Sequence, residues 1–151
     1  MDKLFNSIFE NSLRLLILLD EYDMPKSLDM LYAVDFITLY GASFGITDQN
    51  LNGDNNYMFS VFASHRENIQ ETLKVMVLNG TAQAVSFNAG LTYIITPEGE
   101  DYCHSLESDY AKEYRKTAQA VIKAVSSRSE RTVINAIYKQ SAKSVKGGDV
   151  Q

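Results

Sequence analysis

Residues 81–106 constrain the fold of this 151-residue chain more than any other stretch. Apolar side chains at period two predict a strand that leads into Asn-Ala-Gly at 88–90, residues that tolerate the positive φ of a tight turn. Residues 91–95 are rich in β-branched and aromatic side chains, which predicts the returning strand. Thr96 can then cap a helix that begins at Pro97. The stretch therefore predicts a hairpin followed directly by a helix.

The spacing of Tyr93, Thr96 and Gly99 follows the pattern Y-x-x-T-x-x-G at the start of that helix. A helix, a short hairpin and such a helix start form the layout of a winged helix. We therefore expect an α+β, mostly α fold, namely a winged-helix-like domain with a β-hairpin wing and extended C-terminal helices. We place that domain at residues 1–126 and a basic amphipathic helix and tail at 127–151.

The remaining helices are predicted from apolar residues three and four positions apart. They cover about 6–22, then 28–40 with Ser27 as N-cap, then 64–79 from a capping box formed by Ser64 and Glu67. The helix from Pro97 is expected to reach residue 125 unbroken and to project past the body. A hinge at 126–129 and a last helix that ends at 147–148 follow. Residues 41–56 are expected to form a loop, and residues 57–63 either a strand or a helix.

The net charge of −5 hides an asymmetry. Residues 1–110 hold five Lys or Arg against sixteen Asp or Glu, whereas residues 111–151 hold nine against three. An acidic body argues against broad contact with phosphates, because basic side chains supply nonspecific affinity for nucleic acid. The basic end, with Lys139, Lys143 and Lys146, is either a nucleic-acid contact, a contact for an acidic protein, or a solvated helix face with a loose tail.

Nothing in the sequence suggests a catalytic site, a cofactor or a metal. His65 and His104 are the only histidines and have no ligands at zinc spacing, and the acidic loop at 48–54 lacks the order of an EF-hand. A hydrolase using Cys103 with a histidine is the weakest reading. With one cysteine, no apolar run near 20 residues and no signal-like start, we expect a cytoplasmic chain without a membrane helix.

Asp35 stands out because it lies within an apolar run. A buried carboxylate needs a partner, and Arg14 and Arg66 are the candidates. An exposed Asp35 is the equally weighted alternative. Neither reading makes this residue catalytic.

The helix before the wing is poorly suited to serve as a DNA recognition helix. It offers Asn68, Gln70 and Lys74 to base edges but also carries Glu67 and Glu71, and the wing tip has no basic residue. A protein-binding winged helix is therefore favoured over a DNA-reading one. A homodimeric winged-helix transcription regulator is the runner-up.

Several segments resemble the middle component of bacterial ABC-three-component defence systems, to which Lamassu-type anti-phage and anti-plasmid systems belong. The resemblance covers about residues 4–125 and rests on Leu4-Phe5-Asn6-Ser7, the run ENSLRLLILL at 10–19, Leu28-Asp29-Met30-Leu31, Asp35-Phe36, Tyr40-Gly41, and Leu106, Ser108 and Tyr110 in the helix after the wing. It implies a non-enzymatic subunit between an SMC- or Rad50-like ABC ATPase and an effector nuclease of the same operon. DNA would be met mainly through the complex.

We expect partners to bind the second helix with its loop, the wing and the last helix. The candidate interface residues are Asp29, Tyr32, Asp35, Tyr40, Asn88, Val133, Ile134, Ile137 and Tyr138. Of these, Ile137 and Tyr138 are expected to lose solvent exposure only in the complex.

Overall fold

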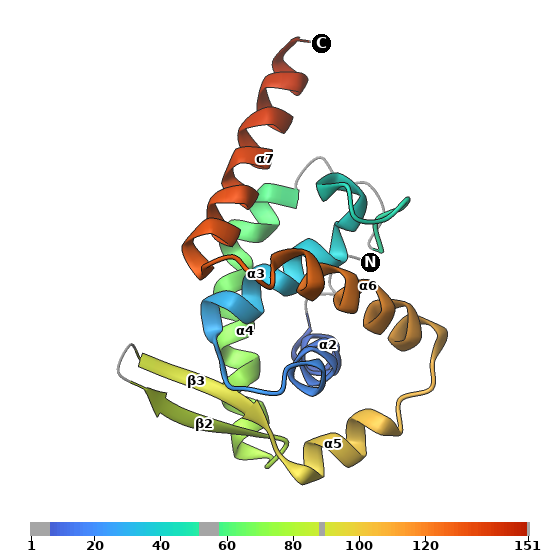
Figure 1. Cartoon of the computed structure of the whole chain (residues 1–151), viewed down its shortest axis with the longest axis vertical. Helices are drawn as coiled ribbons and strands as arrows, with labels where there is room; N and C mark the ends of the chain where they lie inside the picture. Colours follow the sequence, from blue (N-terminus) through green and yellow to red (C-terminus); the bar gives the residue numbers. More distant parts are fainter. Residues whose placement is uncertain (1–6, 52–57, 88–89, 151) are drawn as a thin grey trace.

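The computed structural model describes residues 7–51, 58–87 and 90–150, and it is mostly helical with one small sheet (Figure 1). The α+β, mostly α prediction is therefore confirmed. The elements in chain order are α2 (Ile8–Glu21), β1 (Lys26–Ser27), α3 (Leu28–Leu39), the 3₁₀ helix η1 (Gly41–Phe44), α4 (Met58–Leu78), β2 (Ala82–Phe87), β3 (Gly90–Ile95), α5 (Pro97–His104), α6 (Asp109–Val125) and α7 (Glu130–Val150).

The sheet has the order β1-β3-β2, and both neighbouring pairs are antiparallel. The predicted hairpin is present, with Phe87 opposite Gly90 at its closing end. Gly90 has φ +128°, a conformation that favours glycine. The sequence did not reveal β1, because two residues are too few to show a period.

Short polar side chains start the helices as expected. Ser27 accepts a hydrogen bond from the Met30 backbone N–H, and Thr96 accepts one from Gly99. Both predicted N-caps are therefore confirmed. Gly80, which follows α4, has φ +84° and stops the helix as predicted.

The core is organised around α3. Every residue from 31 to 39 is buried, so this helix is covered on all sides by α2, α4, α6 and α7 (Figure 1). Residues 15–19 of α2 are buried as well. The α7 residues Val133 and Ile137 belong to the same core, so the first turns of α7 pack on the body. In Figure 1 the later turns of α7 extend away from it.

Three predicted boundaries are wrong. The helix from Pro97 does not reach residue 125 unbroken, because Ser108 caps a new helix, α6, which packs on α2 and α3 rather than projecting. Ser64 is not an N-cap, because α4 begins at Met58 and continues through residue 64. Of the two alternatives for residues 57–63, strand or helix, the structure shows a helix over 58–63. The last helix continues through 147–148 to Val150. Within the described residues, no helix is long and apolar enough to cross a membrane.

Candidate partner-binding site

A buried ionic cluster joins four helices around Asp35. Its carboxylate accepts hydrogen bonds from Arg14 of α2, with Nε at 2.9 Å from Oδ1 and Nη2 at 3.2 Å from Oδ2. His65 Nε2 of α4 lies 2.9 Å from Oδ2, and the hydroxyl of Tyr114 of α6 donates to Oδ1 over 2.6 Å. Arg14 also donates to Asn11 Oδ1. All five side chains are buried.

The cluster holds Asp35 ionised. Burial alone raises the pKa of this carboxyl, but the charge of Arg14 and the hydrogen bonds from His65 and Arg14 outweigh it, so its pKa lies well below the ordinary value. Burial and the charge of Asp35 raise the pKa of Tyr114, which therefore remains a donor. Because no member is accessible to solvent, the cluster serves to fix the helices rather than to meet a substrate.

The predicted partner Arg14 is confirmed, whereas Arg66 pairs instead with Asp29 at the surface, with Nε at 2.7 Å from Oδ1. The sequence reading missed His65, which it placed at a helix start. Once α4 is extended back to Met58, His65 falls in helical phase with the buried Ile69, and this periodicity could have revealed it.

Five predicted interface residues are core residues in this structure, so they do not form part of the surface of the isolated chain. They are Tyr32, Asp35, Tyr40, Val133 and Ile137, and at most 5% of each residue is exposed. Ile137 is fully buried in the isolated chain, so its predicted loss of exposure only in the complex is wrong. Their aromatic and aliphatic side chains fill the space around α3, which is where a buried central helix requires them.

Other predicted residues remain available at the surface. Tyr138 is 59% exposed and packs edge-on against Phe62 with the ring centroids 5.7 Å apart. Asp29 and Ile134 are half-buried and Lys139 is exposed. Asn88 and the side chains of Lys143 and Lys146 lie outside the described residues.

A groove lies where the β2–β3 hairpin, the predicted wing, meets α3, α4 and α7, and we call it the wing groove. It has a volume of about 340 Å³ and is lined by Ser27, Asp29, Arg66, Gln70, Leu91 and Glu130, among others. The Arg66–Asp29 pair lies along it, and Ser27 Oγ donates to Glu130 Oε2 over 3.0 Å. Leu91, half exposed, offers an apolar contact beside these charges. The groove is thus lined by the start of α3, the hairpin and the first residue of α7, whereas none of the described residues 41–51 of the loop after α3 lines it.

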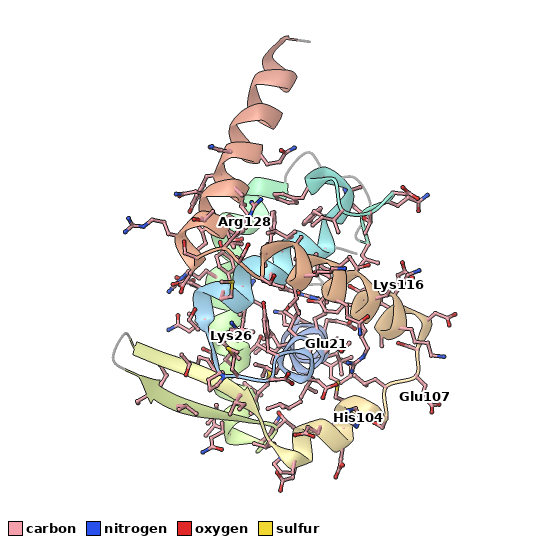
Figure 2. The ribbon with its side chains drawn as sticks, viewed as in Figure 1. Glu21, Lys26, His104, Glu107, Lys116 and Arg128 are labelled. Atoms are coloured by element: carbon pink, nitrogen blue, oxygen red, sulfur yellow. The ribbon has the colours of Figure 1, made fainter. Side chains whose placement is uncertain are left out.

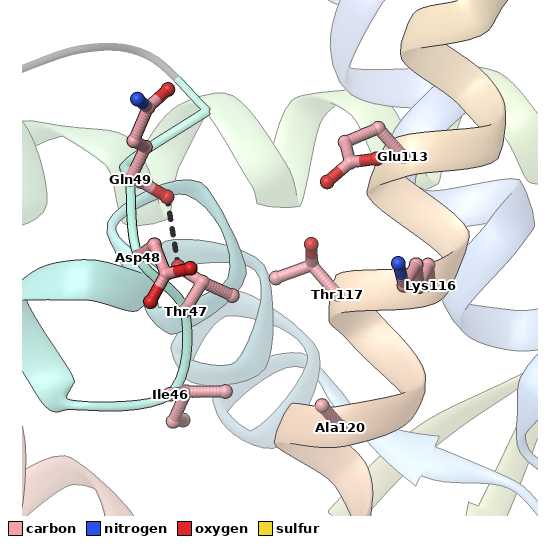
Figure 3. Close-up of a pocket in the computed structure, with 8 residues that line it drawn as sticks. All are labelled: Ile46, Thr47, Asp48, Gln49, Glu113, Lys116, Thr117 and Ala120. Carbon is pink, nitrogen blue, oxygen red and sulfur yellow. Dashed lines mark hydrogen bonds between the residues drawn. The ribbon is translucent and has the colours of Figure 1, made fainter.

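A second recess separates the loop after η1 from α6 (Figure 3). Its volume is about 490 Å³, and residues 46–49 face Glu113, Lys116, Thr117 and Ala120 across it. Thr47 Oγ1 donates to the Gln49 carbonyl oxygen over 2.8 Å and shapes the loop. Within the described part of the chain, no three His, Cys, Asp or Glu side chains gather closely enough to hold a metal ion.

The adjacent Cys103 and His104 do not form a nucleophilic pair. Cys103 Sγ is buried and accepts from Arg115 Nη2 at 3.0 Å, and burial raises the pKa of the thiol to about 11. His104 Nε2 instead lies 3.3 Å from Asp20 Oδ1. A thiol with a raised pKa is a poor nucleophile at neutral pH.

The exposed side of α6 carries Lys112, Lys116 and Lys123 beside the acidic Asp109 and Glu113. Arg128 follows in the turn before α7 (Figure 2). In contrast, α5 exposes Glu98, Glu100 and Asp101. The charge asymmetry of the sequence is therefore also an asymmetry of the surface.

Comparison with known families identifies the group of proteins to which the chain is related. The family model of the ABC-three component (ABC-3C) system Middle Component 2 matches residues 4–147. The chain belongs to this family. No curated protein and no solved structure matches significantly. The match to Middle Component 2 extends past residue 125, where the resemblance seen in the sequence ended, and so includes most of α7.

Proposed function

We propose that this Middle Component 2 chain is a non-enzymatic scaffold and regulatory subunit of a cytoplasmic anti-phage or anti-plasmid defence complex. It bridges an SMC- or Rad50-like ABC ATPase, which senses DNA, and an effector nuclease, as in Lamassu-type systems. The family match over residues 4–147 carries this proposal, because a middle component works with the other components of its system.

The chemistry of the described residues supports a non-enzymatic role. The charged side chains that cluster most tightly, around Asp35, are sealed in the core. The thiol of Cys103 is buried as well. Both groups are buried, so neither presents a reactive atom at the surface of the described chain.

The distribution of surfaces supports bridging. Figure 1 shows the β2–β3 hairpin and α6 on different sides of the body, with α3 between them. The wing groove combines paired charges with the exposed Leu91, whereas the outer side of α6 carries three lysines beside two carboxylates. Two surfaces of different chemistry allow two partners to bind at once.

The same surfaces do not favour the homodimeric transcription regulator. The exposed side of α4 presents Glu67 and Glu71 next to Lys74, so phosphates would be repelled where a reading helix must approach DNA. In our proposal the complex contacts DNA mainly through its other components. Lys139, Lys143 and Lys146 are the candidate residues for direct contact between this chain and DNA.

Affinity purification of the tagged chain from cells that express its neighbouring genes, followed by native mass spectrometry, tests the proposal. Recovery with a large ATPase and an effector is expected. Recovery of the chain only as a homodimer would contradict it.

A further inference from the structure

The recess between the loop after η1 and α6 carries a carboxylate on each wall, and we call it the α6 recess (Figure 3). Asp48 lies on the loop wall and Glu113 on the α6 wall, and both residues are exposed. Among the described residues that line the recess, Lys116 supplies the only positive charge. The recess therefore has a net negative charge, although α6 also carries Lys112 and Lys123.

The floor of the recess holds a buried hydroxyl group. Thr117 is 4% exposed and lines the recess, yet its hydroxyl makes no hydrogen bond within the described residues. The buried Thr38 and Thr72 instead donate to the carbonyl oxygens four residues earlier in their own helices. In Figure 3 the Thr117 oxygen points into the space beside Glu113. This hydroxyl is therefore available to accept a hydrogen bond from a group that enters the recess.

The loop wall is fixed by hydrogen bonds of its own. Asn50 Oδ1 accepts from the Ala42 backbone N–H over 2.8 Å, and the Ile46 N–H donates to the Gly41 carbonyl oxygen over 2.9 Å. Asp48 lies between these anchors. A wall that is formed in advance lowers the entropy cost of binding.

The two ends of the recess suit a cationic side chain with an apolar stem. Ile46 and Ala120 lie at one end of the recess, and Glu113 lies toward the other (Figure 3). Asp48 and Glu113 offer acceptors from opposite walls, with the Thr117 hydroxyl between them. A guanidinium group directs N–H donors to several sides at once, whereas an ammonium group is a compact point charge. Arginine therefore fits the recess better than lysine.

The openness of the recess favours an arginine that is presented by a protein. Asp48, Gln49 and Glu113 are exposed, so a side chain on another protein surface can reach them. Sites for small molecules enclose most of their ligand, which this open recess does not do. Lys116 does not block entry, because it is exposed and its flexible stem can turn the ammonium group toward solvent.

We propose that the α6 recess receives an arginine side chain of another component of the defence complex. The guanidinium group donates to the carboxylates of Asp48 and Glu113 and to the hydroxyl oxygen of Thr117. This inference rests on the proposed function, since it names how one partner of the subunit is held. It also gives the loop after α3, which does not line the wing groove, a part in binding.

Charge-neutral variants in the purified complex test the arginine. The double variant Asp48→Asn, Glu113→Gln keeps the size of both side chains and should lower the recovery of one component by about tenfold. Asp109→Asn is the matched control, because Asp109 is an exposed carboxylate of α6 that is not among the described lining residues, and it should assemble normally. Lys116→Gln should also retain the component. Loss of the component in Lys116→Gln, with retention in the double variant, would show an acidic occupant and overturn the inference.

Two variants of Thr117 separate binding from packing. Thr117→Val keeps the branched shape and removes the hydroxyl, whereas Thr117→Ser keeps the hydroxyl and removes the methyl group. We expect Thr117→Val to weaken recovery of the component by about fivefold and Thr117→Ser to retain it, with both variants melting as folded chains. Greater loss in Thr117→Ser would assign Thr117 to packing alone and refute its contact with the arginine.

Titration of the full-length isolated chain tests the recess without its partner. N-acetyl-arginine amide should cause saturable NMR shifts of the Gln49 and Thr117 amides, and N-acetyl-lysine amide at equal concentration should cause smaller ones. Shifts that are absent, or equal for the two probes, would overturn the selection of arginine.

The remaining outcomes identify the source of the arginine. A homodimer of the isolated chain that Arg128→Gln or Arg131→Gln dissociates would assign the recess to a second copy and refute the partner arginine. Full assembly of the double variant would refute the inference and leave the proposed function standing. Failure of the wild-type chain to co-purify with any component would remove the proposed function and this inference together.

Discussion

The hydroxyl of Tyr114 donates a hydrogen bond to Asp35 over 2.6 Å, although 79 positions separate the two residues. Through this bond α6 is tied to the central helix α3, and through Arg14 and His65 the same carboxylate holds α2 and α4. One ionised side chain therefore sets the relative positions of four helices. The surfaces proposed for partners are built on that frame.

Asp35→Asn should destabilise the chain by about 3–5 kcal/mol, because it leaves the buried Arg14 without its counter-charge. Asp29→Asn, which removes a partly exposed ion pair with Arg66, should cost less than about 1 kcal/mol. Urea unfolding of the wild type and both variants measures the difference. Equal losses for the two variants would contradict the structural role of the cluster.

The lowered pKa of Asp35 gives stability a defined pH dependence. Between the lowered folded value and the ordinary value near 3.8, the unfolded chain binds a proton that the folded chain does not. The contribution of Asp35 is therefore fully present above pH 4 and is lost as pH falls below it. Between pH 7 and pH 3, the urea concentration at the unfolding midpoint should fall more steeply for the wild type than for Asp35→Asn. Parallel curves for the two proteins would contradict this role of Asp35.

Tyr138 and Ile137 should behave differently although they are neighbours on α7. Ile137→Asp places a charge in the core and should unfold the chain, whereas Tyr138→Asp changes an exposed residue and should leave the melting temperature within a few degrees. We expect Tyr138→Asp to weaken assembly with partners. Thermal melts and co-purification measure both effects, and full assembly of folded Tyr138→Asp would remove Tyr138 from the interface.

Cys103 should react slowly in the folded chain. With a pKa of about 11, roughly one thiol in a thousand is ionised at pH 8, and the sulfur is buried. Labelling by an aromatic disulfide reagent should therefore be far faster in urea than in buffer. Cys103→Ala should assemble like the wild type, whereas loss of the complex's activity in an assembled Cys103→Ala would revive a hydrolase role.

The fold was predictable where local signals were strong. Ser27, Thr96 and Gly80 mark element ends through their own side chains or backbone freedom, and the hairpin shows period two. The break at Ser108 was not predictable, because apolar residues keep a helical spacing on both sides of it. The sequence also could not separate an amphipathic face that docks on its own core, as Val133 and Ile137 do, from one that waits for a partner.

The candidate site was predictable only in outline. The wing, α3 and α7 were expected to bind partners; residues from all three line the wing groove, and their binding to a partner stays a prediction. The side chains chosen within α3 were mostly core residues, because this helix is apolar all round and gives no sign of which face is exposed. Asp35 shows the same limit, since its burial depends on His65 and Tyr114 from distant segments.

The most direct test of the bridging role is an omission experiment in cells that express the whole system. The effector is tagged, and the ATPase recovered with it is quantified in the presence of the wild-type chain, without the chain, and with Tyr138→Asp. The account predicts that the ATPase is recovered with the effector only when the chain is present. Equal recovery of the ATPase without the chain would show that it does not bridge them.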